Sequence, residues 1–161
     1  KVKYLYDRIN DFISDDNVLI ADTGDSILNA SNIHLIKDAE YIGQAFYLSI
    51  GYSVSAALGA GLSRSDKRPV VLVGDGAFQM TAQGLSTILH QGLNPIVFLM
   101  NNSGYTIERV FHDGEYNDIY SWKYYQMPEV FGGKAGMRGR HEAISKKHSI
   151  MRQQPKTNWY S

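Results

Sequence analysis

Near its middle the chain reads Pro69-Val70-Val71-Leu72-Val73-Gly74-Asp75-Gly76. The first five of these residues form an unbroken β-branched and aliphatic run, which is typical of a strand buried on both faces of a parallel sheet. A helical pattern follows over residues 81–90, and a second apolar run covers residues 95–100. Strand, helix and strand in this order form a βαβ unit, with parallel strands and a right-handed crossover. The stretch therefore predicts an α/β fold.

The N-terminal part of the chain extends this unit. Apolar residues recur at helical spacing over residues 5–13, and the short apolar run at residues 18–21 predicts another buried strand. Residues 50–62 are rich in Gly, Ala and Ser, which predicts a helix packed closely against its neighbours. We expect an open, mostly parallel sheet that is flanked by helices.

The composition is typical of one soluble globular domain. The 161 residues are 43% hydrophobic and 20% charged, and cysteine is absent. These values argue against disorder and against a disulfide framework. Because the chain shows neither a leader nor an apolar run that could span a bilayer, we expect a cytoplasmic protein without a membrane segment. The formal net charge is zero and no stretch interleaves aromatic with basic residues, so nucleic-acid binding is not expected.

The chain changes character near Arg138. Residues 1–137 hold 10 basic and 15 acidic residues, whereas residues 138–161 hold six basic residues and one acidic residue, Glu142. We expect a domain at 1–137 and an atypical basic tail at 138–161, either mobile or a loosely packed helix. A sheet that lacks its last strand would retain an unpaired edge, which favours self-association.

Three predicted strands end in polar loops that contain glycine, at residues 22–26, 74–77 and 101–104. Ligands of open parallel sheets bind beyond the carboxyl ends of the strands. Adjacent strands would bring the side chains of Asp75 and Asn102 together. Carboxylate and amide oxygens of this kind suit Mg²⁺ or Ca²⁺.

The same edge of the sheet offers a place for a phosphate. The backbone N–H groups of Gly76 and Ala77 lie at the predicted start of a helix, where the donors lack partners within the helix. Taken singly, the Gly-Asp-Gly and Asn-Asn segments are more often ordinary turns. Found together at strand ends one βαβ unit apart, they indicate a metal ion and a diphosphate.

Gly74-Asp75-Gly76 and Asn101-Asn102 resemble the signature of enzymes that depend on thiamine diphosphate (ThDP). The resemblance implies that Asp75, Asn102 and the main-chain oxygen of Gly104 bind Mg²⁺. The metal in turn would hold the diphosphate of the cofactor.

Further matches indicate one branch of this family. Residues 21–26 resemble the diphosphate loop of pyruvate and indolepyruvate decarboxylases, and residues 102–108 and 112–119 are similar to the same group. Glu108 favours the decarboxylases, because carboligases of the acetolactate synthase type lack a glutamate in this setting. The cofactor-binding residues implied by the resemblance are Thr23, Asp25, Leu48, Ile50, Gly74, Asp75, Gly76, Ala77, Asn102, Gly104 and Tyr105.

The resemblance places Leu48 and Ile50 next to the cofactor. Ile50 falls where the family places a bulky apolar residue under the bent cofactor. At Leu48 the decarboxylases usually carry glycine, whose carbonyl accepts a hydrogen bond from the aminopyrimidine amine. A leucine carbonyl can accept the same bond.

The resemblance also implies a reaction. A 2-oxo acid would lose carbon dioxide on the cofactor and leave as an aldehyde. Glu108 would be the catalytic residue, as a proton donor or relay. Ile107 and Tyr105 would line the substrate pocket, and the substrate would carry a small aliphatic or an aryl side chain.

Two parts of such an enzyme are absent from this sequence. The glutamate that activates the aminopyrimidine and a pair of active-site histidines belong to a pyrimidine-binding domain, normally of a partner subunit. We therefore expect a homo-oligomer and a chain that is inactive alone, whether it is a fragment, a split subunit or the product of a disrupted reading frame. The alternatives are a non-catalytic ThDP-binding module and a carboligase. A Rossmann domain is disfavoured because no Gly-x-Gly-x-x-Gly follows a strand.

Overall fold

The computed structural model describes residues 2–35 and 38–134. Helices and strands alternate through most of this part of the chain. The order is α1 (Val2–Phe12), β1 (Asn17–Ala21), α2 (Asp25–Ala30), β2 (Glu40–Gly43), α3 (Tyr52–Ser63), β3 (Arg68–Gly74), α4 (Asp75–Thr81), α5 (Gly84–His90), β4 (Ile96–Met100), α6 (Thr106–Phe111), η1 (Glu115–Asn117), η2 (Tyr124–Gln126) and α7 (Met127–Val130).

The four strands form one parallel sheet in the order β2-β1-β3-β4. Val71 of β3 pairs with Ile20 of β1 on one side and with Val97 of β4 on the other. The expected α/β class with an open parallel sheet is confirmed, as are the strands predicted at the three apolar runs. Strand β2 was not predicted. The helix expected over residues 81–90 is α5, which begins at Gly84, and a separate helix, α4, precedes it. Ala82 and Gln83 between the two helices keep helical dihedral angles, but their carbonyls accept hydrogen bonds from the N–H groups three residues later.

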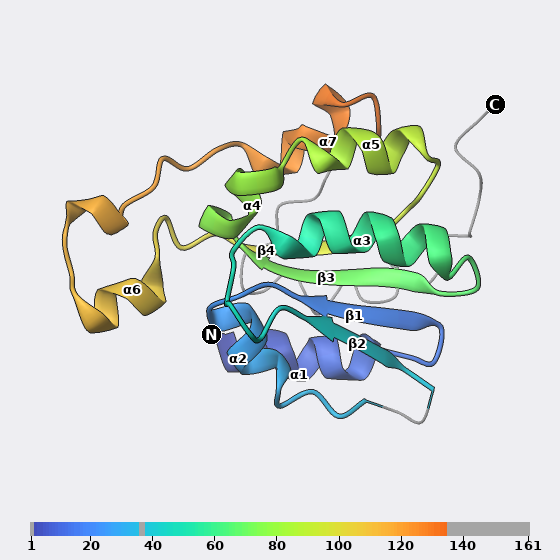
Figure 1. The fold of residues 1–161 in the computed structure, drawn as a ribbon, viewed down its shortest axis with the longest axis horizontal. Coiled ribbons are helices and arrows are strands. Elements are labelled where there is room, and N and C mark those ends of the chain that lie inside the picture. The colour runs from blue at the N-terminus through green and yellow to red at the C-terminus, as the bar shows by residue number, and fades with distance from the viewer. Residues whose placement is uncertain (1, 36–37, 135–161) are drawn as a thin grey trace.

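Helices cover both faces of the sheet (Figure 1). Alternate residues of each strand face opposite sides, so Ile20 and Val71 pack with α3, α4 and α5, whereas Leu19 and Leu72 pack with α1 and α2. The helix α1 turns Tyr6, Ile9 and Phe12 toward the sheet, which is the face that its spacing predicts. This two-sided burial is why the strand sequences are apolar without interruption.

Strand β4 lies at an edge of the sheet. Among the described residues it pairs with β3 alone, and all five of its residues are only half-buried. An edge of this kind can pair with another chain. The predictions made for residues 138–161 lie outside the described residues, as does the boundary at residue 137.

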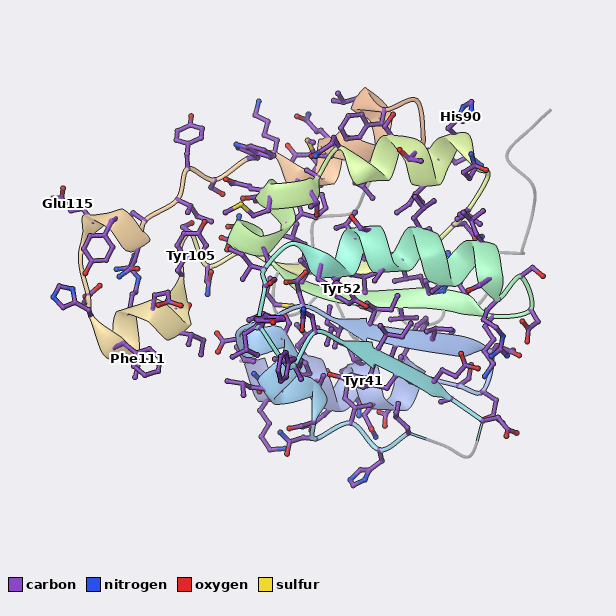
Figure 2. The ribbon with its side chains drawn as sticks, in the orientation of Figure 1. Tyr41, Tyr52, His90, Tyr105, Phe111 and Glu115 are labelled. Atoms are coloured by element: carbon purple, nitrogen blue, oxygen red, sulfur yellow. The ribbon has the colours of Figure 1, made fainter. Side chains whose placement is uncertain are left out.

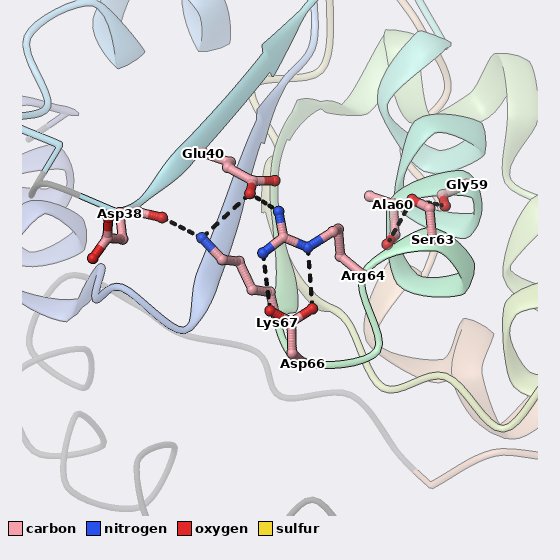
Figure 3. Close-up of polar contacts among 8 residues, drawn as sticks. All are labelled: Asp38, Glu40, Gly59, Ala60, Ser63, Arg64, Asp66 and Lys67. Atoms are coloured by element: carbon pink, nitrogen blue, oxygen red, sulfur yellow. Dashed lines mark hydrogen bonds and ion pairs between the residues drawn. The ribbon is translucent and has the colours of Figure 1, made fainter.

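An ion network fastens strand β2 at the amino end of the sheet (Figure 3). Arg64, in the turn after α3, pairs with Glu40 and with Asp66, and Lys67 Nζ lies 3.4 Å from the same Glu40 carboxylate. The hydrogen bond from Arg64 lowers the pKa of Asp66 to about 2. Exposed ion pairs add little to stability, so this network chiefly sets where β2 lies.

No helix in the described ranges is long and apolar enough to cross a bilayer.

Candidate functional site

The loops that follow β1 and β4 and the start of α4, which directly follows β3, meet at the carboxyl edge of the sheet. Asp75 is the first residue of α4 and only 1% exposed. Its Oδ1 accepts a hydrogen bond from Gly76 N at 2.9 Å, and its Oδ2 accepts one from Ser103 N at 2.6 Å. A buried carboxylate thus links the start of α4 to the loop after β4.

The Asn102 amide and the Gly104 carbonyl lie beside this carboxylate. The Asn102 amide oxygen lies 3.0 Å from Asp75 Oδ1 and 3.0 Å from the Gly104 carbonyl oxygen, while the amide nitrogen contacts the Thr106 hydroxyl. Three acceptors this close repel one another unless a cation lies between them. With the amide turned over, Nδ2 would donate to both oxygens and Oδ1 would accept from Thr106. The cluster therefore fits either a bound cation or, without one, the reversed amide.

The donors at this place are unlike those of an acidic or histidine metal centre. Within the described ranges no three His, Asp or Glu side chains gather where they could hold a metal ion. The converging groups are one carboxylate, one amide and one main-chain carbonyl. Such neutral and singly charged oxygen donors suit hard divalent cations that keep several water ligands.

Tyr105 covers the start of α4. A Cβ added to Gly76 would lie 2.4 Å from Tyr105 Cε1, so only glycine allows the ring to take this position. The Gly76 N–H already donates to Asp75, which corrects the expectation that this donor is open to a phosphate. Ala77 follows it and is buried at the same helix start. Gly74 precedes α4, and a Cβ there would meet no atom within 4 Å.

The loop after β1 contacts two other parts of the site. Thr23 Oγ1 is 3.4 Å from the carbonyl oxygens of both Gln44 and Ser49. A Cβ on Gly24 would lie 3.9 Å from Ile107 Cγ1, so α6 faces this loop. The structure thus brings Thr23 and Ile107, which are far apart in sequence, to one side of the site.

Residues 44–51, between β2 and α3, form a third segment of the site. Leu48 has a φ of 53° and Gly51 a φ of 85°, both in the left-handed region. Leucine adopts this conformation at a cost, whereas glycine does so freely. A glycine at position 48, as the decarboxylases usually carry, would therefore fit the observed backbone. The side chains of Leu48 and Ile50 are both exposed.

Comparison with known proteins identifies this arrangement. The model of the family described as thiamine pyrophosphate enzyme, C-terminal TPP binding domain, matches residues 22–154. The chain belongs to this family. An alpha-keto-acid decarboxylase of Mycolicibacterium paratuberculosis is 42% identical over 133 residues, which are 81% of this chain and 23% of the relative. Pyruvate decarboxylase 1 of Oryza sativa subsp. indica is 47% identical over 124 residues, or 77% of this chain and 20% of the relative.

A solved structure shares the fold of this ThDP-binding domain. It is the X-ray structure of a thiamin diphosphate-dependent enzyme isolated from Mycobacterium smegmatis, with a TM-score of 0.70 and 19% sequence identity. The match covers 82% of this chain and 25% of that one. The predicted membership of the ThDP-dependent enzymes is confirmed, and the relatives of this chain include decarboxylases. The chain spans less than a quarter of the length of the two decarboxylases above.

Glu108 lies in α6, away from the buried part of the domain. Its side chain is exposed and makes no hydrogen bond or ion pair with the rest of the described chain. Figure 2 shows Tyr105 where this segment leaves the body of the domain, and Phe111 and Glu115 farther out on it. The described residues by themselves do not enclose Glu108 in a dry pocket.

The segment that carries Glu108 is braced by its own contacts. Arg109 pairs with Asp113 and Asp118, and Tyr105 N donates to the Asn117 carbonyl at 2.9 Å. Gly104 and Asp118 form a β-bridge that closes the base of the segment. These contacts hold α6 as a defined lobe beside the site.

One buried acid was not singled out from the sequence. Asp22 directly follows β1, is fully buried, and accepts hydrogen bonds only from backbone N–H groups. The signal that could have found it is an acidic residue directly after an apolar strand. A charged side chain at such a place is seldom buried unless it has hydrogen-bond partners. The sequence predicts only a polar loop at this position.

Tyr6 lies next to the start of α2, and its burial predicts that the stability of the fold depends on pH. Burial raises the pKa of Tyr6 above its ordinary value of 10.0, and its hydroxyl lies 3.5 Å from the Asp25 carbonyl oxygen. The folded state therefore keeps the proton longer than the unfolded state. Stability from this group is complete below pH 10 and is lost above it, by up to about 1.4 kcal/mol per pH unit.

Urea unfolding at several pH values between 9 and 11 measures this effect. Tyr6→Phe should flatten the decline, whereas Tyr47→Phe, at an exposed position, should leave it unchanged. Equal declines in wild type and Tyr6→Phe would contradict the prediction.

Proposed function

We propose that this chain binds ThDP together with Mg²⁺ and is the cofactor-binding domain of a non-oxidative 2-oxo acid decarboxylase. The observation that carries the proposal is the cluster of oxygens from Asp75, Asn102 and Gly104 at the carboxyl edge of the sheet. The cluster adjoins the start of α4, where the Gly76 N–H donates to Asp75 and the N–H of Ala77 lacks a partner within the helix.

The types of donor favour a hard divalent cation. A carboxylate, an amide oxygen and a main-chain carbonyl oxygen are ligands that suit Mg²⁺ or Ca²⁺. Of the two we propose Mg²⁺, which the resemblance to ThDP-dependent enzymes implies. The 3.0 Å contacts of the Asn102 amide equally fit hydrogen bonds from the reversed amide when no cation is bound.

The rest of the site fits a bound diphosphate cofactor. Thr23 lies in the loop after β1, and Asp25 is the first residue of α2. The other residues proposed to contact the cofactor come from the loop after β2, from the junction of β3 with α4 and from the loop after β4. When bound, ThDP supplies the electron sink that lets a 2-oxo acid lose carbon dioxide. Glu108 would hold or move a proton next to the substrate, and Ile107 and Tyr105 would line its pocket.

Exposed apolar side chains on residues 44–51 and on the segment that carries α6 support a covering partner. Phe46 is 85% exposed and Phe111 is 80% exposed, and Tyr47, Val110 and Tyr120 are exposed as well. Large apolar groups gathered beside a ligand site are typical of an interaction surface. We propose that a pyrimidine-binding domain of a partner subunit covers them in a homo-oligomer, and that the chain alone does not turn over substrate.

Calorimetric titration of ThDP into the 161-residue chain tests the cofactor proposal. Heat should be released with Mg²⁺ present and vanish when EDTA removes it, and thiamine without the diphosphate should not bind. Equal ThDP affinity with Mg²⁺ and with EDTA would contradict the metal-dependent site.

Aldehyde formation from pyruvate and indolepyruvate separates an enzyme domain from a non-catalytic module. The chain alone should form none, and addition of a separately made pyrimidine-binding domain should restore turnover. Binding of ThDP without turnover in that mixture would favour the non-catalytic module. Formation of 2-hydroxy ketones in place of aldehydes would favour a carboligase.

A further inference from the structure

The Asp22 side chain lies at a place that solvent does not reach. Its relative exposure is 0%. Its Oδ1 accepts hydrogen bonds from Thr23 N at 2.9 Å and Gly51 N at 3.0 Å, and its Oδ2 accepts one from Ser53 N at 2.8 Å. Burial of a carboxylate is costly unless it is fully hydrogen-bonded, so these contacts define where it can lie.

The backbone of Asp22 is itself held by the sheet. Asp22 N donates to the Leu72 carbonyl at 2.8 Å, which extends the pairing of β1 with β3 by one residue. The carboxylate therefore reaches out from the rigid centre of the domain. It contacts the loop after β1 on one side and the start of α3 on the other.

The contact with Gly51 connects Asp22 to residues 44–51 of the site. Gly51 ends the loop that carries Leu48 and Ile50, and its carbonyl accepts a hydrogen bond from Thr81 Oγ1 of α4 at 2.7 Å. Asp22 thus couples the loop after β1, the loop before α3 and, through Gly51, the helix that begins with Asp75.

The negative charge suits this place. Ser53 lies at the start of the 12-residue helix α3, where unpaired N–H groups and the helix dipole favour an anion. An asparagine side chain would have the same shape, but its NH₂ group would face an N–H donor. The three bonds need a carboxylate, because only a carboxylate has acceptors on both atoms.

We propose that Asp22 is a positioning residue for ThDP, which sets the distance between Thr23 and the loop that bears Leu48 and Ile50. This role rests on the proposed function. It differs from a purely structural role because loss of the carboxylate would weaken ThDP binding beyond what lost stability explains.

The test compares Asp22→Asn with a variant that is destabilised elsewhere. Ile88→Ala removes a buried side chain of α5, and Ser53→Ala removes a buried hydroxyl that has no partner among the described residues but keeps the N–H that Asp22 accepts. ThDP affinity is measured by calorimetry at saturating Mg²⁺, under conditions where each variant is folded. Amide hydrogen exchange is followed at Gly51 and Ser53.

Asp22→Asn should weaken ThDP binding at least tenfold and speed exchange at Gly51 and Ser53. Ile88→Ala and Ser53→Ala should change the affinity less than twofold. Asp22→Glu keeps a carboxylate but displaces it, so it should show an intermediate loss of affinity. If Asp22→Asn does not fold, the ThDP affinity of Asp22→Glu tests the proposal in its place.

The outcomes separate the two proposals. Wild-type affinity in Asp22→Asn or in Asp22→Glu, or an equal loss in Ile88→Ala, would overturn the positioning role while leaving ThDP binding intact. Absence of ThDP binding by the wild-type chain with Mg²⁺ would contradict the proposed function, and the positioning role with it.

Discussion

Asp75→Ala should abolish the Mg²⁺-dependent binding of ThDP. Asp75 is the only charged group among the three oxygens proposed to bind the metal, and it is 1% exposed. Without it, an amide and a carbonyl would have to hold a divalent cation between them. We expect affinity to fall on the order of 100-fold, which corresponds to about 2.7 kcal/mol. Calorimetric titration of ThDP with Mg²⁺ measures the loss.

Asp75→Ala will also lower stability, so a second variant is needed. The carboxylate accepts bonds from Gly76 N and Ser103 N, and each donor left unsatisfied costs about 1–3 kcal/mol. Asn102→Ala removes another proposed ligand at an exposed position and should weaken binding with little change in the free energy of unfolding. Asp66→Ala, at the opposite end of the strands, should affect neither. Wild-type affinity in Asp75→Ala would remove this residue from the metal site.

Gly51→Ala should be strongly destabilising. Gly51 has a φ of 85°, and an added Cβ would lie 2.7 Å from Met80 Cβ and 3.3 Å from the Ala77 carbonyl oxygen. Left-handed backbone costs an L-residue about 1–2 kcal/mol, and the steric overlap adds to that. We expect a loss of about 2–4 kcal/mol in the free energy of unfolding, measured by urea titration.

Gly59→Ala is the matched control within the same region. Gly59 lies inside α3, and a Cβ added there would meet no atom within 4 Å. Alanine should raise stability by about 0.5–1 kcal/mol, because it favours the helix and restricts the unfolded chain. Equal stability of Gly51→Ala and Gly59→Ala would show that the loop before α3 adapts without strain.

The parts of the fold that sequence predicted are those whose signals are local. Strands β1, β3 and β4 are buried or half-buried on both faces, so their apolar runs could be recognised directly. Strand β2 was missed because Glu40 and Tyr41 belong to an edge that an ion network and one neighbour hold in place. The break between α4 and α5 was missed because Ala82 and Gln83 keep helical dihedral angles, so that only the hydrogen-bond pattern changes there.

The chemistry of the site divides in the same way. Polar and glycine residues after each strand marked the edge where a ligand would bind, because every parallel strand delivers its carboxyl end to that edge. Sequence could not show that Gly76 N–H is taken by Asp75, nor that Glu108 is exposed in this chain. Both facts depend on how one loop lies against another.

By itself, then, the sequence determined the α/β class, the ThDP-dependent family and the strand ends that carry the candidate ligands, since each follows from residues close together along the chain. Only the tertiary structure decided that the Asn102 amide lies beside the Asp75 carboxylate and the Gly104 carbonyl, and that Asp22 accepts hydrogen bonds from two loops at once. Those contacts join residues that are separated by a helix and a strand, or by a whole loop. Their distances are set by how the helices and strands pack, which no local pattern records.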